Sequence, residues 1–470
     1  MFSLKNIYVY GLCALSLLGL VGCANQPKTY DAISSNVTYS VPRSIEDIWQ
    51  SRGLGFDNIG YILQDLKTGQ TLSSANGDEG FIPASTAKLF TAYAALKILG
   101  PDYRFQTKLC ADRDTLYLLG GGDPALKVEN LMDMASQLDA KSASYNNFYY
   151  DDSLYPQIDY VEKTQPFDAY YNPPVRALST QDALLLINWQ PSDKDGEVLL
   201  FQSPSLTPKS ADVPREWLFD KQVGHKGQSR FPLKNPALHT ANLFQLFAKQ
   251  NGVELPKAQH NKKGRPTCDQ PQVIHESPPI KTLVNELLKT SSNLQAELLG
   301  LAVAQSLGAS SQSLKQSASV LAKWYEAEFS NIDWREFYLA NHSGLSVETR
   351  ISPNHMVALL NQAKPELLTL MPISGWKGWL KKRLLTPDVS LRVWAKTGTV
   401  NYGIGLSGYL FAKSERPMAF TIFINDLNKR RAYDLADEAG RLQMDVAASA
   451  WNSNARQVVD ELVRYWVYNN

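Results

Sequence analysis

The stretch Pro83-Ala84-Ser85-Thr86-Ala87-Lys88 opens an apolar, alanine-rich segment that runs from Leu89 to Leu99 and ends at Gly100-Pro101. The proline before this segment and the glycine after it predict a buried helix. Residues three apart share one face of a helix, so the Lys88 amine should lie beside the Ser85 hydroxyl. A serine needs a base to become a nucleophile, and a lysine can be that base only when burial or a second cation keeps it neutral. Ser85 is therefore the predicted nucleophile.

The Ser-x-x-Lys spacing is weak evidence by itself, because a serine can cap a helix and a first-turn lysine can point into solvent. The spacing occurs again at Ser374-Gly375-Trp376-Lys377. No long apolar helix follows that second copy. Only Lys88 has a predicted environment that would desolvate its amine.

The composition excludes some classes of partner. The 470 residues carry a net charge of +1, with 44% hydrophobic and 20% charged residues. This describes an ordinary globular protein of roughly two to three domains. Balanced charge without a basic block argues against nucleic acid binding, which needs clustered lysine and arginine. No cluster of metal-ligating residues stands out and no cofactor is predicted, so chemistry on a small molecule or a polymer is favoured.

The N-terminal segment has the layout of a secretory signal, predicted over residues 1–22, with an apolar run too short for a comfortable membrane span. Leu20-Val21-Gly22-Cys23 resembles the lipobox of bacterial lipoproteins. Cys23 is therefore predicted to be lipidated, with residues 23–43 as a tether to the membrane. By the same resemblance, Ala24 after the cysteine favours the outer membrane. The alternative is a soluble secreted protein that is cut nearby.

Two further cysteines, Cys110 and Cys268, belong to the mature chain. An exported protein can oxidise them. They form either one disulfide or two buried thiols, and the sequence leaves both outcomes open.

Patterns of the same kind occur at both ends of the mature chain. Short strands alternate near its start and again near its end, where an amphipathic helix over residues 455–468 closes the chain. The middle is rich in tyrosine, asparagine, aspartate and proline, which is typical of a loop-laden, β-rich insertion. The predicted strands outside it are residues 59–65, 71–74, 391–396, 405–411 and 417–425. The predicted divisions after the tether are an acyl-transfer domain over 44–104 and 278–470 and an inserted region over 105–277.

Two more motifs follow Ser85-x-x-Lys88 along the chain. They are Ser291-x-Asn293 and Lys396-Thr397-Gly398-Thr399. The three together are the set found in penicillin-binding proteins and class A β-lactamases. A second Lys-Thr-Gly occurs at residues 67–69, in a predicted hairpin turn. The Lys396 copy follows a predicted strand over 391–395, and Gly398 is small enough for a substrate backbone to lie against the strand edge.

The chain resembles the class C low-molecular-mass penicillin-binding proteins, a family of serine D-alanyl-D-alanine carboxypeptidases and endopeptidases. The resemblance extends from about Gly60 to Asp426. It implies an α+β fold: a serine β-lactamase/transpeptidase-like helix–sheet–helix domain with an inserted β-rich region. Besides the three motifs, it is carried by Leu118-Leu119-Gly120-Gly121-Gly122-Asp123-Pro124 and Ser343-Gly344-Leu345-Ser346.

The resemblance also implies roles for single residues. Ser85 would attack the carbonyl between two D-alanines, or between D-alanine and a cross-linking diamino acid, to give an acyl-enzyme that water hydrolyses. Lys88 would be the base, and Ser291 would relay a proton between Lys88 and the leaving amine. Asn293 would bind the substrate amide, and Lys396 would add positive charge. Thr397 and Thr399 would bind the terminal carboxylate, and the backbone N–H groups of Ser85 and Thr399 would form the oxyanion hole.

The chain departs from the family pattern at two places. Ser292 stands where an aspartate is usual, and Asn341-His342 replaces a usual Asp-Gly before Ser343. Each change removes a carboxylate near the predicted site, which affects the expected rate and substrate charge preference but not the nucleophile. His342 is interpreted as structural, since no partner is visible in the sequence.

The sequence favours a periplasmic, lipid-anchored enzyme at the outer membrane that acts on peptidoglycan stem peptides and is acylated by β-lactam antibiotics. The first alternative is a β-lactamase that uses the same serine, which would need a deacylating base that the sequence does not identify. The second is a non-catalytic envelope lipoprotein that binds wall peptides. Retention of all three motifs argues against the second alternative.

Overall fold

The computed structural model describes residues 44–139, 144–191, 198–203 and 227–470. The predicted signal segment, Cys23 and the tether lie outside these residues. Among the described residues, no helix combines the length and the apolar character needed to cross a membrane.

The central sheet joins the two ends of the described chain, as the strand patterns predicted. Its strand order is β11-β12-β13-β1-β2, and every neighbouring pair is antiparallel. The contact between β1 and β13 sets Ile59 opposite Ile424 and Asp65 opposite Met418. The strands are β1 (Ile59–Asp65), β2 (Thr71–Ala75), β11 (Val393–Val400), β12 (Gly403–Phe411) and β13 (Pro417–Asn425).

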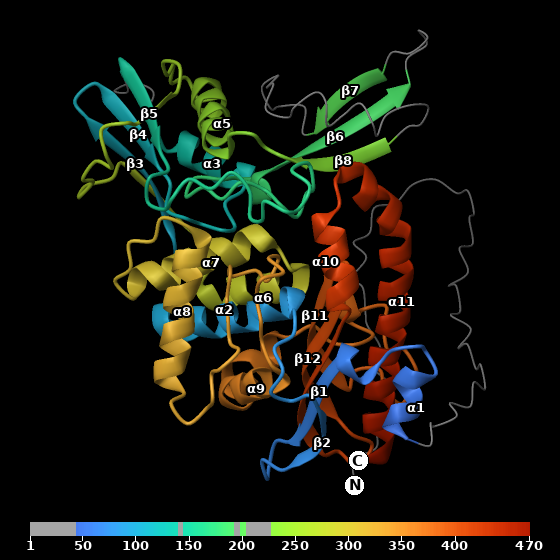
Figure 1. Cartoon of the computed structure of the whole chain (residues 1–470). Helices are drawn as coiled ribbons and strands as arrows, with labels where there is room; N and C mark the ends of the chain where they lie inside the picture. The colour runs from blue at the N-terminus through green and yellow to red at the C-terminus, as the bar shows by residue number, and fades with distance from the viewer. Residues whose placement is uncertain (1–43, 140–143, 192–197, 204–226) are drawn as a thin grey trace, which may run out of the picture. The chain divides into compact units, whose positions relative to one another are not determined.

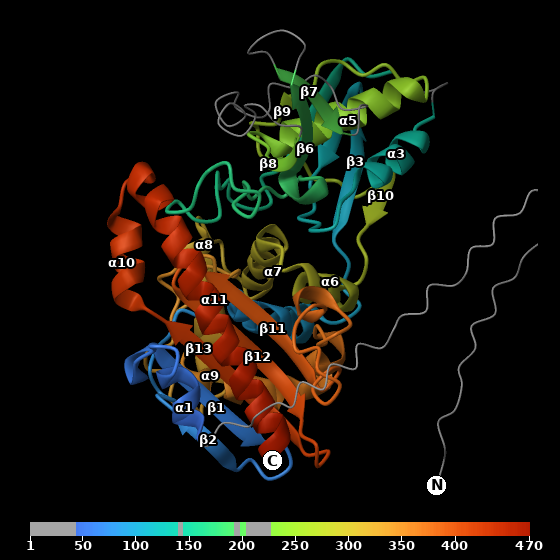
Figure 2. The ribbon, with the colours of Figure 1, turned by 90° about the vertical axis from the view of Figure 1, so that its right-hand side faces the viewer.

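Helices cover both faces of this sheet (Figure 1). On one face lie α1 (Ile45–Gln50) and α11 (Glu438–Asn469), which crosses the strands in Figure 2 and buries Trp466 against them. The other face packs against a larger helical layer that includes α2 (Lys88–Ala94). The predicted helix–sheet–helix arrangement is confirmed. The remaining helices of that layer are α6 (Ile280–Thr290), α7 (Asn293–Ser306), α8 (Leu314–Glu328) and α9 (Pro353–Leu367), while α10 (Leu427–Leu435) precedes α11.

The helix that begins at Ser85 is less regular than predicted. Ala84–Ala87 form a 3-10 turn, α2 follows, and Ala95–Leu99 close as a π turn before Gly100 at φ +92°. Close packing from two sides explains the tight first turn. A Cβ on Gly398 would lie 2.5 Å from the Pro83 carbonyl oxygen, and one on Gly344 would lie 2.1 Å from that of Ala84. The turn that carries Ser85 is therefore clamped by backbone on both sides.

Two other boundaries differ from the predictions. β11 continues to Val400, so Lys396 and Thr399 lie inside the strand instead of following it. α11 begins at Glu438, well before residue 455. The prediction missed its first half because the residues there are largely exposed and lack the amphipathic pattern on which the prediction rested.

The inserted region contains two sheets, ordered β10-β3-β4-β5-β9 and β7-β6-β8. It also contains α3 (Val128–Ser136) and α5 (Pro236–Gln250), which share a core with the first sheet, where Phe244 of α5 contacts Phe148 of the sheet. The strands are β3 (Gln106–Asp112), β4 (Thr115–Leu119), β5 (Asn147–Asp151), β6 (Leu184–Pro191), β7 (Val198–Ser203), β8 (Gly227–Pro232), β9 (Gln259–His260) and β10 (Val273–Glu276).

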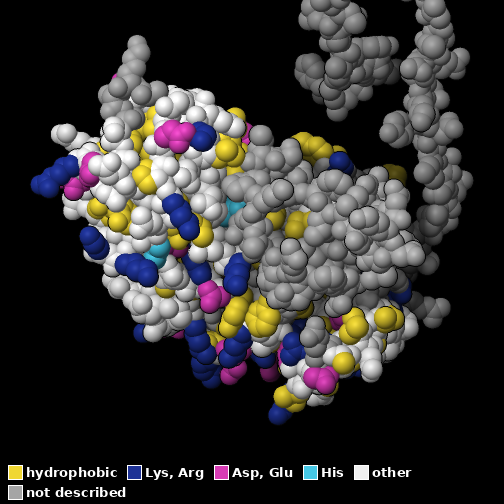
Figure 3. Space-filling view, turned by 90° about the horizontal axis from the view of Figure 1, so that it is seen from above, with side chains coloured by type: hydrophobic (Ala, Val, Ile, Leu, Met, Phe, Trp, Pro, Cys, Tyr) yellow, Lys and Arg dark blue, Asp and Glu magenta, His cyan; other side chains and the backbone are white. Residues whose placement is uncertain are grey.

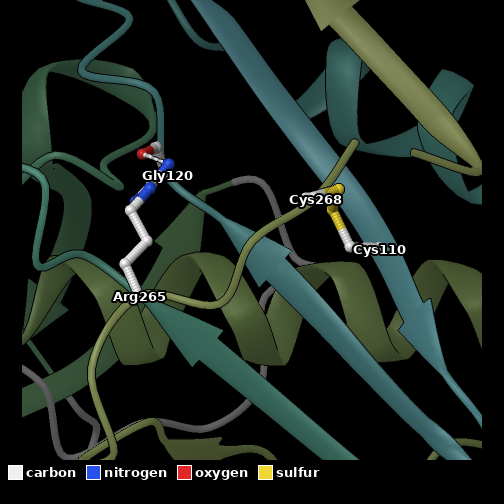
Figure 4. Close-up of a disulfide and its surroundings, with 4 residues drawn as sticks. All are labelled: Cys110, Gly120, Arg265 and Cys268. Atoms are coloured by element: carbon white, nitrogen blue, oxygen red, sulfur yellow. Dashed lines mark hydrogen bonds between the residues drawn. A yellow bond between two sulfur atoms is a disulfide. The ribbon is translucent and has the colours of Figure 1, made fainter. Parts of the chain in front are cut away.

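A disulfide joins Cys110 on β3 to Cys268, with a Cα–Cα distance of 6.0 Å (Figure 4). Close by, Arg265 donates hydrogen bonds to the Gly120 carbonyl at 2.8 Å and to Asp151 at 3.1 Å. The disulfide and the arginine together fasten the loop after β9 to the first sheet of the inserted region.

The molecular face in Figure 3 bears interspersed basic and acidic side chains among its coloured residues. No continuous basic surface is visible on that coloured part.

Candidate active site

A cleft with a volume of about 1550 Å³ brings residues of all three predicted motifs together. Its lining includes Ser85, Ser291, Asn293, Thr397 and Thr399. Behind this lining, Lys88 and Lys396 are fully buried. Ser85 itself is half-buried and lines the cleft, whereas its neighbours along the chain are buried.

The Lys88 amine is held by three oxygen atoms. Its Nζ lies 2.9 Å from Ser85 Oγ, 2.6 Å from Asn293 Oδ1 and 2.8 Å from the Ser343 carbonyl oxygen. Burial lowers the pKa of Lys88 well below its usual value, the Lys396 charge lowers it further, and Glu297 opposes the shift. A neutral amine has two N–H groups and one lone pair. In that state Lys88 can donate to Asn293 and Ser343 and accept the Ser85 proton.

The second lysine, Lys396, donates hydrogen bonds to Ser291 Oγ and to the Thr397 carbonyl, both at 2.8 Å. Burial lowers its pKa to about 7. The structure thus pairs Ser291 with Lys396, and among the described residues no hydrogen bond joins Ser291 directly to Lys88. When Lys396 is protonated, its positive charge therefore lies next to Ser291 of the second motif.

The edge of β11 faces the cleft. Its first half is covered by residues 372–374, since Ala395 donates its backbone N–H to the Pro372 carbonyl at 2.9 Å. Strand N–H groups alternate between edges with a period of two, so those of Thr397 and Thr399 point to the same outer edge as that of Ala395. Thr399 therefore presents a backbone donor to the cleft, as an oxyanion hole requires.

The second motif has an unusual backbone. Ser291 ends α6 in the left-handed region at φ +64°. Ser292 caps α7, where its Oγ accepts the Gln295 N–H at 3.3 Å. Asn293 donates its Nδ2 to the Tyr171 carbonyl of the inserted region at 2.7 Å, which leaves its Oδ1 directed at Lys88.

A carboxylate from the inserted region reaches this motif. The Ser292 hydroxyl donates to Asp182 Oδ1 at 3.0 Å, and burial raises the pKa of Asp182. Gln181, Asp182 and Ala183 all have positive φ, between 52° and 58°. Such backbone costs about 1–3 kcal/mol per residue and persists only where the surroundings fix it. Asp182 thus supplies a carboxylate at the position where the motif has Ser292 instead of the usual aspartate. Asp182 lies 110 positions earlier in the chain, and no sequence pattern indicated it.

Glu297 is a second residue that the motifs did not identify. It is fully buried one turn after Asn293, and its two oxygens accept the backbone N–H groups of His342 at 3.0 Å and Ser343 at 2.9 Å. Burial raises its pKa to about 7. These bonds fix the peptide whose Ser343 carbonyl accepts from Lys88. A glutamate four residues after Asn293 in an otherwise apolar helix was the available signal.

His342 packs in the core behind the site. Its Nε2 lies 2.7 Å from Ser317 Oγ, and burial lowers its pKa to about 3. A Cβ on Gly300 would lie 2.0 Å from the histidine ring. His342 does not line the cleft, which agrees with its interpretation as a structural residue.

The two repeated motifs lie elsewhere. Ser374 is fully buried and its Oγ bonds the backbone of Val389 and Val393, while Lys377 donates to Asn285. Residues 67–69 form the turn after β1, where Asp65 accepts their backbone N–H groups. Neither of these repeated copies lines the cleft.

Comparisons with known proteins agree with this geometry. The sequence matches the D-Ala-D-Ala carboxypeptidase 3 (S13) family over residues 41–212 and 222–450. It is 26% identical over 473 residues to a D-alanyl-D-alanine carboxypeptidase of Actinomadura sp. strain R39, covering 88% of this chain and 86% of that protein. It is 24% identical over 448 residues to the D-alanyl-D-alanine carboxypeptidase DacB of Haemophilus influenzae, covering 83% and 90%.

A solved structure shares the fold. Penicillin binding protein 4 (dacB) from Haemophilus influenzae superposes with a TM-score of 0.70 at 22% identity, covering 81% of this chain and 93% of that one. The family match spans most of the sequence and both parts of the acyl-transfer domain. The chain therefore belongs to the D-Ala-D-Ala carboxypeptidase 3 (S13) family and is a serine peptidase of the low-molecular-mass penicillin-binding type.

Proposed function

We propose that Ser85 is the nucleophile of a D-alanyl-D-alanine carboxypeptidase/endopeptidase that cleaves peptidoglycan stem peptides through an acyl-enzyme. The observation that carries this proposal is the 2.9 Å contact between Ser85 Oγ and the buried Lys88 amine, whose pKa is lowered. An amine with a lowered pKa beside a half-exposed hydroxyl is a nucleophile–base pair.

In acylation, neutral Lys88 accepts the Ser85 proton as Oγ bonds to the scissile carbonyl carbon. The carbonyl oxygen gains negative charge, and the backbone N–H groups of Ser85 and Thr399 stabilise it. The C–N bond then breaks, and the proton taken up by Lys88 passes to the leaving amine; Ser291, which accepts a hydrogen bond from Lys396 in the structure, is the proposed relay. Water later attacks the ester carbonyl carbon and gives a proton to Lys88; the bond between that carbon and Ser85 Oγ then breaks, and Lys88 returns the proton to Ser85 Oγ.

The third motif fits the carboxyl end of the substrate. Thr397 and Thr399 offer hydroxyls and backbone donors along the open edge of β11, and Lys396 adds charge nearby through Ser291. Gly398 has no side chain, and a Cβ at this position would overlap the turn that carries Ser85. Asn293 holds Lys88 on one side and the inserted region on the other, and its side chain is placed to meet the substrate amide.

We further propose that the mature protein is a periplasmic lipoprotein, anchored through Cys23 at the outer membrane. The lipobox-like sequence before Cys23 supports this anchor. Membership in a cell-wall peptidase family supports the periplasm. Labelling with a radioactive fatty acid tests the anchor, because a Cys23→Ser variant should lose the label.

Brief exposure to benzylpenicillin, followed by intact mass measurement and peptide mapping, tests the nucleophile. The Haemophilus influenzae protein has been solved in complex with a β-lactam, which supports the choice of probe. A penicilloyl group that persists on Ser85, and is absent from a Ser85→Ala variant, is the expected result. Hydrolysed drug without an adduct would indicate a β-lactamase, and intact drug without an adduct would indicate a non-catalytic binding protein.

A further inference from the structure

Four arginines that belong to none of the motifs line the same cleft as Ser85, and two of them, Arg383 and Arg456, are neighbours. Arg456 on α11 is half-buried and forms no hydrogen bond or ion pair with any residue in the described part of the chain. Arg383 donates to Asp460 at 2.5 Å, but its Nε is buried without a hydrogen-bond partner. Burial and the charge of Arg383 both lower the pKa of Arg456. Two guanidinium groups therefore share one carboxylate neighbour, and donors are left unused.

Contacts along α11 place this pair near the end of β11. Asn452 donates to the Val400 carbonyl at 3.0 Å at the end of that strand. Arg456 lies one helical turn further and Asp460, which holds Arg383, one turn beyond it on the same face. On the other side, Trp379 donates to the Thr290 carbonyl at 3.2 Å, next to Ser291. The arginines thus share one cleft with Thr397 and Thr399.

An anion in the cleft at this position would accept hydrogen bonds from the Arg456 guanidinium and offset the repulsion between two like charges. A guanidinium binds a carboxylate through paired N–H groups and stays charged at any physiological pH. Because the cleft partly excludes water here, such a contact is stronger than one on an open surface.

The chemistry of the two leaving groups decides which anion fits. A D-alanine leaving group has one carboxylate, which Thr397 and Thr399 are proposed to bind. A leaving group that continues into a second stem peptide carries further carboxylates beyond the first. We propose that Arg383 and Arg456 form an anion subsite that binds such a second carboxylate, so that the enzyme prefers cross-linked peptides. This inference rests on the proposed function of the Ser85 site.

The test compares two substrates in one assay series, a cross-linked peptide dimer and the uncross-linked pentapeptide. Wild-type enzyme should have the higher kcat/KM on the dimer. Arg456→Gln should lower the ratio of the two values at least tenfold, mainly through KM for the dimer, and Arg456→Lys should lower it less. Higher salt should reduce the wild-type preference. Arg464→Gln, two turns further along α11 and outside the cleft, is the matched control and should keep the wild-type ratio.

Other outcomes would overturn the inference. Equal losses on both substrates in Arg456→Gln would mean that the arginine binds the terminal carboxylate itself. An unchanged ratio in Arg456→Gln and Arg383→Gln, or a wild-type enzyme that cleaves only the pentapeptide, would mean that no such subsite operates. Penicillin acylation of Ser85 in the same preparations separates these results from failure of the proposed function, because an unfolded or inactive protein would not be acylated.

Discussion

Replacing Lys396 with methionine should remove part of the pH dependence of stability. Burial lowers the pKa of Lys396 from 10.5 in the unfolded chain to about 7 in the folded protein. Between these values the unfolded chain binds more protons than the folded protein, so the free energy of unfolding rises with pH in this window. Linkage gives a rise of about 2 kcal/mol between pH 7 and pH 9 from this one residue. Lys396→Met should lack that contribution.

Urea unfolding at pH 7 and pH 9, followed by tryptophan fluorescence, measures this difference. Lys381→Met makes the same substitution at an exposed lysine and should keep the wild-type pH dependence. Any rise in the pKa of Lys88 after loss of Lys396 would act in the same direction, since Lys88 also has a lowered pKa. If Lys396→Met gains as much stability between pH 7 and pH 9 as wild type does, the pKa of Lys396 is not lowered in the folded protein and the reasoning fails.

The same variant separates two causes of Lys88 basicity. Burial is the larger cause of its lowered pKa and the Lys396 charge the smaller one. The pH profile of penicillin acylation in Lys396→Met should therefore move upward and the rate should fall, while the Lys88 pKa stays below its ordinary value. An unmoved profile would leave burial as the sole cause.

Three further changes test the surroundings of the site. Glu297→Gln replaces two acceptor oxygens by one, so the backbone N–H of either His342 or Ser343 loses its partner. Acylation measured by stopped flow should slow about tenfold, and an unchanged rate would refute the positioning role of Glu297. Ser292→Asp should slow acylation because it sets a second carboxylate against Asp182, and the exchange Ser292→Asp with Asp182→Ser should restore the rate; no rescue would mean that the contact is incidental. Gly300→Ala should destabilise the protein by about 1–3 kcal/mol in urea unfolding, because the added methyl group would overlap His342. Adding His342→Ala to the same chain should relieve part of that cost, and additive losses would contradict the overlap.

Sequence patterns predicted the central sheet because each of its strands alternates or is continuously apolar over its own length. They also predicted the buried helix behind Ser85, since Leu89 to Leu99 leave it no polar face. The long α11 was predicted only in its second half, because the first half is largely exposed and shows no continuous apolar face. Short-range patterns contain no information on which distant loop meets a motif. For that reason the sequence did not predict Asp182 and Arg456 at the site. Glu297 shares a helix with Asn293, so it could have been identified from the sequence.

The strained backbone of the protein shows where tertiary packing overrides local preference. Ala84, Ser291 and Asp182 are non-glycine residues with positive φ, and each adjoins or belongs to the cleft. They precede the proposed nucleophile, end the helix before the second motif, and carry the carboxylate that meets Ser292. Each costs free energy that only the surrounding contacts can offset. Because three separate segments bear this cost at one place, and two buried lysines with lowered pKa add to it, the site is maintained against stability, as expected where binding and proton transfer require a fixed geometry.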